Sequence, residues 1–234
     1  MSKFVDLYRY VLAQGLIAQD KSNLFTPQAA SLADLSIVHD MAYLQKLCGN
    51  QVDQREWRRV GLPWSQALVE RTLTAPNGTL LTARLALQSG LACHLAGGTH
   101  HAHYDFGSGY CMINDLAYTA EVLLQSGECQ RVLIFDLDVH QGDGTAAILH
   151  NQPNAFTCSI HCEKNFPFRK QHSDLDVGLD VGLEDAAYLK VVSTTLNDLL
   201  DTVQPDLVLY DAGVDTWAQD DLGRLNISTQ GMHD

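Results

Sequence analysis

The chain has 234 residues, of which 46% are hydrophobic and 18% charged, as is usual for a globular protein with a packed core. Its formal net charge of -13 argues against a nucleic-acid partner, because phosphate binding needs a basic surface. No apolar stretch has the length that a bilayer crossing requires, so we expect no membrane partner.

The amino terminus and the cysteines indicate a cytoplasmic protein. Residues 1–10 carry scattered charges in place of the apolar segment of a signal peptide. The six cysteines form no C-x-x-C pair, and we expect them to be reduced and mostly buried.

The first half of the chain is predicted to be helical. Residues 2–18 carry apolar side chains at helical spacing, which indicates an amphipathic opening helix. Shorter helices are expected over 40–48 and 64–73. An Ala- and Leu-rich segment over 79–95 predicts a long buried helix that ends at the glycine pair 97–98.

In the second half, helices and strands alternate. The sequence predicts helices over 114–124, 142–149 and 185–203, and buried strands over 131–138, 155–160 and 206–210. Such alternation is typical of an α/β protein in which helices cover both faces of a mainly parallel sheet. Since no repeat or linker interrupts the chain, we predict one three-layer domain over 1–234. Ligands bind sheets of this kind at the carboxyl ends of the strands.

Potential metal ligands follow two of these strands. Asp136, Asp138 and His140 alternate along the end of the first strand, so their side chains point to the same side. Asp215 follows the third strand. Asp138, His140 and Asp215 offer two carboxylates and one imidazole and leave coordination positions open, as catalytic metal sites do. We expect zinc, and the same donors accept Fe(II).

Two adjacent histidines, His100 and His101, follow the glycine pair, with Asp136 and Asp143 available as partners. A carboxylate bonded to one ring nitrogen fixes the tautomer and raises the basicity of the other nitrogen. Because two carboxylate ligands neutralise much of the metal's charge, the metal acidifies water less than an all-histidine site does. A nearby histidine is therefore expected to serve as general base. We expect His103 to be structural.

Aromatic residues lie near the same strand ends. Gly109-Tyr110 and the loop over 165–168 bring aromatic side chains to this edge of the sheet. Such side chains belong either to the core or to the walls of a slot for an aliphatic chain.

In order and spacing, the motifs from about Gly97 to Gly231 resemble those of the histone deacetylase superfamily. This group includes bacterial acetoin-utilisation proteins and acetylpolyamine amidohydrolases and has the arginase–deacetylase fold. The resemblance implies a catalytic role for His100, His101, Asp136 and Asp143, and a zinc site at Asp138, His140 and Asp215. It also implies a substrate tunnel at Gly109, Tyr110 and Phe168, and a structural potassium ion near Asp136 and Ser159.

The implied reaction is hydrolysis of an N-acyl amide on a lysine-like or polyamine substrate, either an acylated small amine or an acetyl-lysine peptide. Zinc would polarise the acyl carbonyl, while His101, paired with Asp143, takes a proton from water. His100 and Asp136 would assist this base.

This chain differs from the family pattern at both ends. Downstream of the last zinc ligand, family members carry a tyrosine that follows a glycine run and donates a hydrogen bond to the oxyanion. They also begin with a further strand. This chain ends at Asp234 before such a segment, so we expect shortening at both ends and weaker turnover. We also expect a homo-oligomer that covers the exposed sheet edge.

Two alternatives stay open at this point. The chain could be a metal-binding but inactive relative that binds acyl ligands or assembles with a partner. Less favoured is an arginase-like hydrolase with two metals, for which Asp211 supplies an extra carboxylate. Turnover of an acetyl-lysine substrate would distinguish a zinc-dependent deacylase from the inactive relative. The number of bound metal ions would distinguish it from the two-metal hydrolase.

Overall fold

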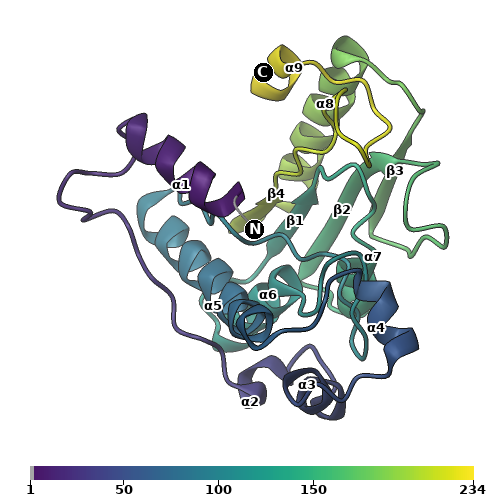
Figure 1. Ribbon diagram of the computed structural model, residues 1–234. Helices are drawn as coiled ribbons and strands as arrows, with labels where there is room; N and C mark the ends of the chain where they lie inside the picture. Colours follow the sequence, from purple (N-terminus) through teal and green to yellow (C-terminus); the bar gives the residue numbers. More distant parts are fainter. Residues whose placement is uncertain (1–2) are drawn as a thin grey trace.

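The computed structural model describes residues 3–234, and Figure 1 shows their helices arranged around a central sheet. The first half contains α1 (Lys3–Ala13), α2 (Leu32–Leu35), α3 (Met41–Cys48), α4 (Gln54–Val60), α5 (Gln66–Ser89) and α6 (Asp115–Ser126). The second half contains β1 (Val132–Asp136), α7 (Asp143–Leu149), β2 (Ala155–Cys162), β3 (Leu175–Leu179), α8 (Asp185–Val203), β4 (Leu207–Asp211) and α9 (Thr229–His233). Within the described residues, no helix combines the length and apolar character needed to cross a membrane.

The four strands form one parallel sheet in the order β3-β2-β1-β4. The chain runs from β1 outward through β2 and β3, and then returns to place β4 on the other side of β1. The strand order therefore reverses between β1 and β4. At such a switch point the carboxyl ends of the strands border a crevice in which ligands bind. The segments that follow β1 and β4 meet at this crevice.

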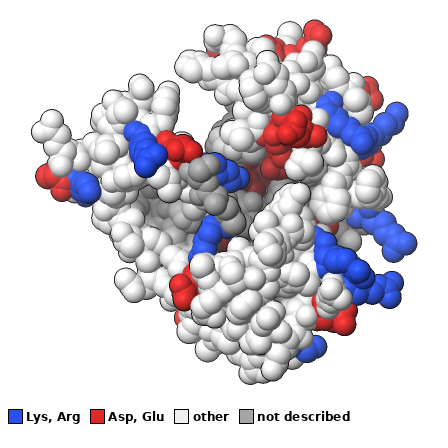
Figure 2. All heavy atoms as spheres, viewed as in Figure 1, with Lys and Arg blue, Asp and Glu red and all other residues white. Residues whose placement is uncertain are grey.

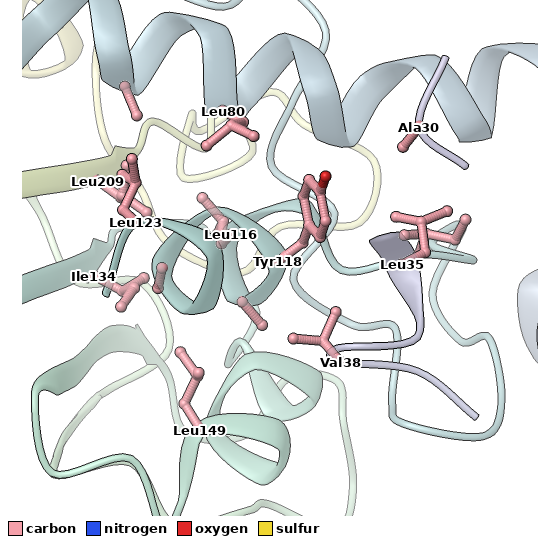
Figure 3. Packing of buried hydrophobic residues seen from close by; sticks show 14 of the residues in the cluster. Ala30, Leu35, Val38, Leu80, Leu116, Tyr118, Leu123, Ile134, Leu149 and Leu209 are labelled. Carbon is pink, nitrogen blue, oxygen red and sulfur yellow. The ribbon is translucent and has the colours of Figure 1, made fainter. Parts of the chain in front are cut away.

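Helices cover both faces of the sheet, as predicted. Successive side chains of β1 face opposite sides, so Val132 and Ile134 enter one core while Leu133 and Phe135 enter the other. The first core includes side chains of α2, α3, α5, α6 and α7, and the second includes those of α8. Figure 3 shows Ile134 in the first core beside Leu209 of β4 and residues of α6. The predicted three-layer α/β architecture is confirmed.

The structure corrects the prediction for the helices of the first half. The helices expected over 64–73 and 79–95 form the single helix α5, which contains Pro76. A proline removes one backbone hydrogen bond from a helix, and the buried residues on either side of Pro76 hold α5 together across it. Gly90, at φ +88°, ends α5 well before the glycine pair at 97–98. The opening helix, expected over 2–18, ends at Ala13, and residue 2 lies outside the described residues.

The predicted strands and the helix over 185–203 are confirmed to within a few residues. The sequence prediction missed β3, because this edge strand alternates partly buried and exposed residues and contains Asp and Gly. It also missed α2, α4 and α9, which have seven residues or fewer. Helices this short carry little periodic signal.

His39 connects two loops of the core. Its Nε2 accepts a hydrogen bond from the backbone N–H of Asn114 (2.9 Å), so its Nδ1 carries the proton and donates to the carbonyl of Tyr104 (3.2 Å). The side chain is fully buried, and burial lowers the pKa of His39 to about 4. The histidine is therefore neutral in the folded protein at neutral pH.

We predict that His39 makes the folded state sensitive to acid. Its folded pKa lies below the value of about 6.5 expected in the unfolded chain, so its stabilising contribution is present above pH 6.5 and falls as the pH drops towards 4. Between pH 8 and pH 5 this loss amounts to about 2 kcal/mol. Urea unfolding at both pH values, compared between wild type and His39→Gln, measures it. The exposed His150→Gln is the control, and equal pH dependence in all three proteins would contradict the prediction.

Candidate active site

Three potential metal ligands converge beyond β1 and β4. Nδ1 of His140 lies 3.0 Å from Oδ1 of Asp138 and 3.1 Å from Oδ2 of Asp215. One ligand atom of each residue lies within 4.8 Å of the others. The backbone N–H groups of His140 and Val139 donate to Asp138 and Asp215, which fixes the orientation of both carboxylates. One nitrogen and two carboxylate oxygens around one point fit a zinc or Fe(II) ion with open coordination positions.

The backbone after β4 approaches this centre closely. Gly213 passes so near Asp138 that a Cβ atom at this position would collide with the Asp138 backbone. Glycine is required there because the two segments at the switch point pack against each other. This close approach brings Asp215 to the ligands that follow β1.

The structure brings together both predicted histidine–carboxylate pairs. Nδ1 of His100 lies 2.7 Å from Oδ2 of Asp136, and Nδ1 of His101 lies 2.6 Å from Oδ1 of Asp143. The two imidazole rings are neighbours, with centroids 4.1 Å apart. None of the four side chains is more than 7% exposed. Each imidazole therefore shares a proton with a carboxylate away from bulk water.

The two histidines differ in charge. Burial, together with the positive charge of His100, lowers the pKa of His101 to about 4, so His101 is neutral at pH 7. Burial opposes a charge on His100 as well, but the carboxylates of Asp136 and Asp138 raise its pKa well above the usual value. Hydrogen bonds from the histidines outweigh burial at Asp143 and lower its pKa to about 2. The Nδ1 proton of His101 therefore faces an ionised carboxylate, and its Nε2 is free to accept a proton.

The loop that carries both histidines is anchored by Asp115, which the sequence prediction did not single out. This carboxylate is fully buried at the start of α6. It accepts hydrogen bonds from the backbone N–H groups of Gly98 (3.0 Å) and Thr99 (2.7 Å). The hydroxyl groups of Thr99 and Thr79 donate to it as well. Asp115 thus fixes the backbone immediately before His100.

The aromatic wall is formed differently from the prediction. Phe168, expected in the tunnel, is 89% exposed and lies away from the histidines. Phe166 takes this place, with its ring edge-on to His101 (centroids 4.9 Å apart) and near His140 (6.1 Å). The difference arises in the loop after β2, whose path turns Phe166 inward and Phe168 to the surface. Tyr110 contributes to the lining of the hollow, and 54% of it is exposed.

Gly109 lies against the ring of His101. It adopts a left-handed conformation with φ +51°, and a Cβ atom there would collide with the imidazole of His101. Gly109 therefore allows the 106–111 loop to pass directly beside this histidine.

The site opens into a hollow of about 2010 Å³ whose walls include residues of α1, α5 and β4. Figure 2 shows this hollow facing the viewer, with acidic side chains gathered beside it. The three potential metal ligands, both histidines and Phe166 all contribute to its lining. A substrate that enters the hollow can therefore reach the histidines and the metal ligands together.

Two further features surround the histidine pairs. Asp136 and Ser159 are register partners on β1 and β2 and are both buried, so the two residues implied in a potassium site lie side by side. His100, Asp136 and Asp211 form a second group whose potential ligand atoms lie within 4.8 Å of one another. Oδ2 of Asp211 is buried without a hydrogen-bond partner among the described residues and lies 3.6 Å from Nδ1 of His100.

The parallel α/β sheet thus carries two Asp–His pairs beside an Asp-His-Asp group of potential metal ligands at its switch point. Residues 2–234 match the histone deacetylase domain, and the chain belongs to this family. It is 50% identical over 233 residues to an uncharacterized protein of Picosynechococcus sp., a match that covers 100% of this chain and 77% of that protein. It is 29% identical to the acetoin utilization protein AcuC of Staphylococcus aureus, covering 89% of this chain and 59% of AcuC.

A solved structure of an HDAC homolog complexed with SAHA is similar, with a TM-score of 0.82 and 25% sequence identity. The match covers 97% of this chain and 66% of the HDAC homolog. The arginase–deacetylase fold is thereby confirmed, and the chain spans about three-fifths to three-quarters of the length of these relatives.

Proposed function

We propose that this protein is a zinc-dependent deacetylase that hydrolyses the N-acyl amide of a lysine-like or polyamine substrate. The observation that carries the proposal is the position of His101. It is a neutral imidazole, oriented by an ionised carboxylate, in the same hollow as the Asp138-His140-Asp215 group. Membership in the histone deacetylase family supports deacetylase-type hydrolysis.

Asp138, His140 and Asp215 would hold the zinc ion, which draws electron density from the acyl carbonyl and makes a water molecule more acidic. Nε2 of His101 takes the proton of the attacking water. The developing imidazolium is stabilised by Asp143, which accepts the Nδ1–H bond at 2.6 Å. The same Nε2–H then donates its proton to the leaving amine.

His100 has a different role, because the carboxylates of Asp136 and Asp138 outweigh its burial in the metal-free protein, raise its pKa and favour its charged form. The cation lies beside His101, where it limits the basicity of that ring and stabilises negative charge that develops in the transition state. Asp136 fixes the ring through its hydrogen bond to Nδ1.

Phe166 and Tyr110 support a substrate with an aliphatic stem. Both line the hollow next to the histidines, and aromatic walls favour the methylene chain of a lysine or polyamine over a polar substrate. The HDAC homolog bound to SAHA has this fold, so we propose that SAHA also occupies this hollow.

Further expectations accompany the proposal. A potassium ion near Asp136 and Ser159 would support the ends of β1 and β2 beneath the histidine pair. A single domain over 1–234, a cytoplasmic location and self-association that covers an exposed sheet edge stay predictions.

The proposal is tested with metal-free protein, an acetyl-lysine peptide and an N-acetylated polyamine. We expect acetate release from at least one substrate after zinc is added, inhibition by SAHA, and loss of activity with a chelator. Binding of zinc and SAHA without acetate release from either substrate would contradict it.

Zinc binding is predicted to weaken in acid. Burial opposes a charge on His140, but its hydrogen bonds to Asp138 and Asp215 raise its pKa to about 9 in the metal-free protein. Zinc must displace this proton, so the apparent Kd should rise about tenfold for each pH unit below 9. Calorimetry at pH 6 to 8, in buffers with different ionisation enthalpies, should detect the proton that is released. An affinity independent of pH over this range would contradict the prediction.

A further inference from the structure

Asp143 is shared by two imidazoles. Its Oδ1 lies 2.6 Å from Nδ1 of His101, and its Oδ2 lies 3.0 Å from Nε2 of His103. Since a carboxylate ionised at neutral pH can only accept, both histidines donate to it. The second bond lies outside the two histidine–carboxylate pairs described above.

His103 is held in place on the side away from Asp143. Its ring stacks on that of Phe106 with centroids 4.4 Å apart and planes 14° apart. Its backbone N–H donates to the carbonyl of Phe106 (3.0 Å), which closes the turn between them. The guanidinium group of Arg59 lies over the Phe106 ring, 5.1 Å from its centroid. The direction in which His103 Nε2 points is therefore fixed by packing.

The hydrogen bonds from the two histidines to Asp143 are shielded from water. The side chain of His101 is 5% exposed, that of Asp143 is 7% exposed, and that of His103 is 12% exposed. Hydrogen bonds to a charged group are strong at such burial. The terminal torsion of an aspartate is broad, so a single bond at Oδ1 leaves the carboxylate plane poorly fixed. A second bond at Oδ2 removes this freedom.

We propose that His103 is a positioning residue that holds Asp143 in the orientation in which Oδ1 meets His101. The inference rests on the proposed function, in which His101 is the base. His103 does not line the hollow, and its side-chain hydrogen bond goes to Asp143, so it acts through Asp143. Its contribution is the Nε2–H donor to Oδ2 of Asp143.

Two matched substitutions distinguish the effect of the His103 Nε2–H donor from that of its ring stacked on Phe106. His103→Gln keeps an N–H donor of similar reach and loses the stacking on Phe106. His103→Phe keeps an aromatic ring on Phe106 and loses the donor. Zinc content and thermal unfolding of both variants show whether each one folds.

In the zinc-loaded protein, we expect His103→Phe to lower kcat on an acetyl-lysine peptide about tenfold with KM unchanged. His103→Gln should stay within about twofold of the wild type. A loss in the Gln variant with full activity in the Phe variant would overturn the proposal in favour of packing. Equal loss in both variants, or no loss in either, would also overturn it.

A second readout does not depend on turnover. In protein with ¹⁵N-labelled histidine, the Nδ1–H proton of His101 reports its hydrogen bond to Asp143. We expect this NMR signal to move in His103→Phe and to keep its wild-type position in His103→Gln. An unchanged signal in both variants would refute the positioning role. Failure of the proposed function appears instead as a wild-type protein without acetate release, in which this NMR comparison is still decisive.

Discussion

Replacement of His101 by alanine is expected to lower kcat on an acetyl-lysine peptide by about 10²–10⁴-fold while zinc binding is retained. His101 supplies the only imidazole in the described site that is both neutral at pH 7 and paired with an ionised carboxylate next to the metal ligands. Without it, no group with a free nitrogen accepts the proton of the attacking water. Steady-state kinetics and metal analysis of the same samples measure both parts of the prediction.

The matched control is His150→Ala, because His150 lies exposed at the end of α7 and takes no part in the site. Its kcat should equal that of the wild type. If His101→Ala kept more than a tenth of wild-type kcat, His101 would not be the general base.

Replacement of Asp115 by alanine is expected to lower the free energy of unfolding by about 3 kcal/mol. The substitution removes the fully buried acceptor of the partly buried backbone N–H groups of Gly98 and Thr99, and of the buried hydroxyl of Thr79. Water replaces these hydrogen bonds only in part, so their loss costs free energy. Urea unfolding at pH 7.5 measures the loss, which should be accompanied by weaker turnover because the loop carries His100 and His101.

Asp206 provides the control for Asp115, because it also accepts two backbone N–H bonds, from Gln130 and Arg131, but at the surface. In Asp206→Ala water can replace the lost acceptor, so the destabilisation should be much smaller. Equal losses in the two variants would show that burial of the Asp115 network adds nothing.

The grouping of the potential metal ligands could be predicted from sequence only in part. The strand predicted over 131–138 ends at Asp136, and Asp138 and His140 lie in the bend beyond it. The strand order brings Asp215 close to them at the switch point. The layers of the fold followed in the same way from the alternation of buried strands and helices. Both predictions rest on the regular strands, whose order decides which segments meet at the carboxyl edge of the sheet.

Other parts of the site depend on irregular backbone or on contacts between distant segments. The sequence contains two similar phenylalanines, Phe166 and Phe168, and only the path of the loop decides which one faces the histidines. Asp115 and His103 looked like ordinary polar residues, because their partners are 16 to 40 positions away in the chain. The sequence signal for Asp115 was an acidic residue at the start of the predicted helix over 114–124, and only the structure shows that it is buried.

The most direct test of the zinc-dependent mechanism is a zinc titration of metal-free protein in which acetate release from an acetyl-lysine peptide is followed. The Asp138-His140-Asp215 group predicts that activity rises linearly and stops rising at one equivalent of zinc. Activity that needs two equivalents would favour a two-metal centre that includes the His100-Asp136-Asp211 group. Activity that is absent, or unchanged by zinc, would contradict the mechanism.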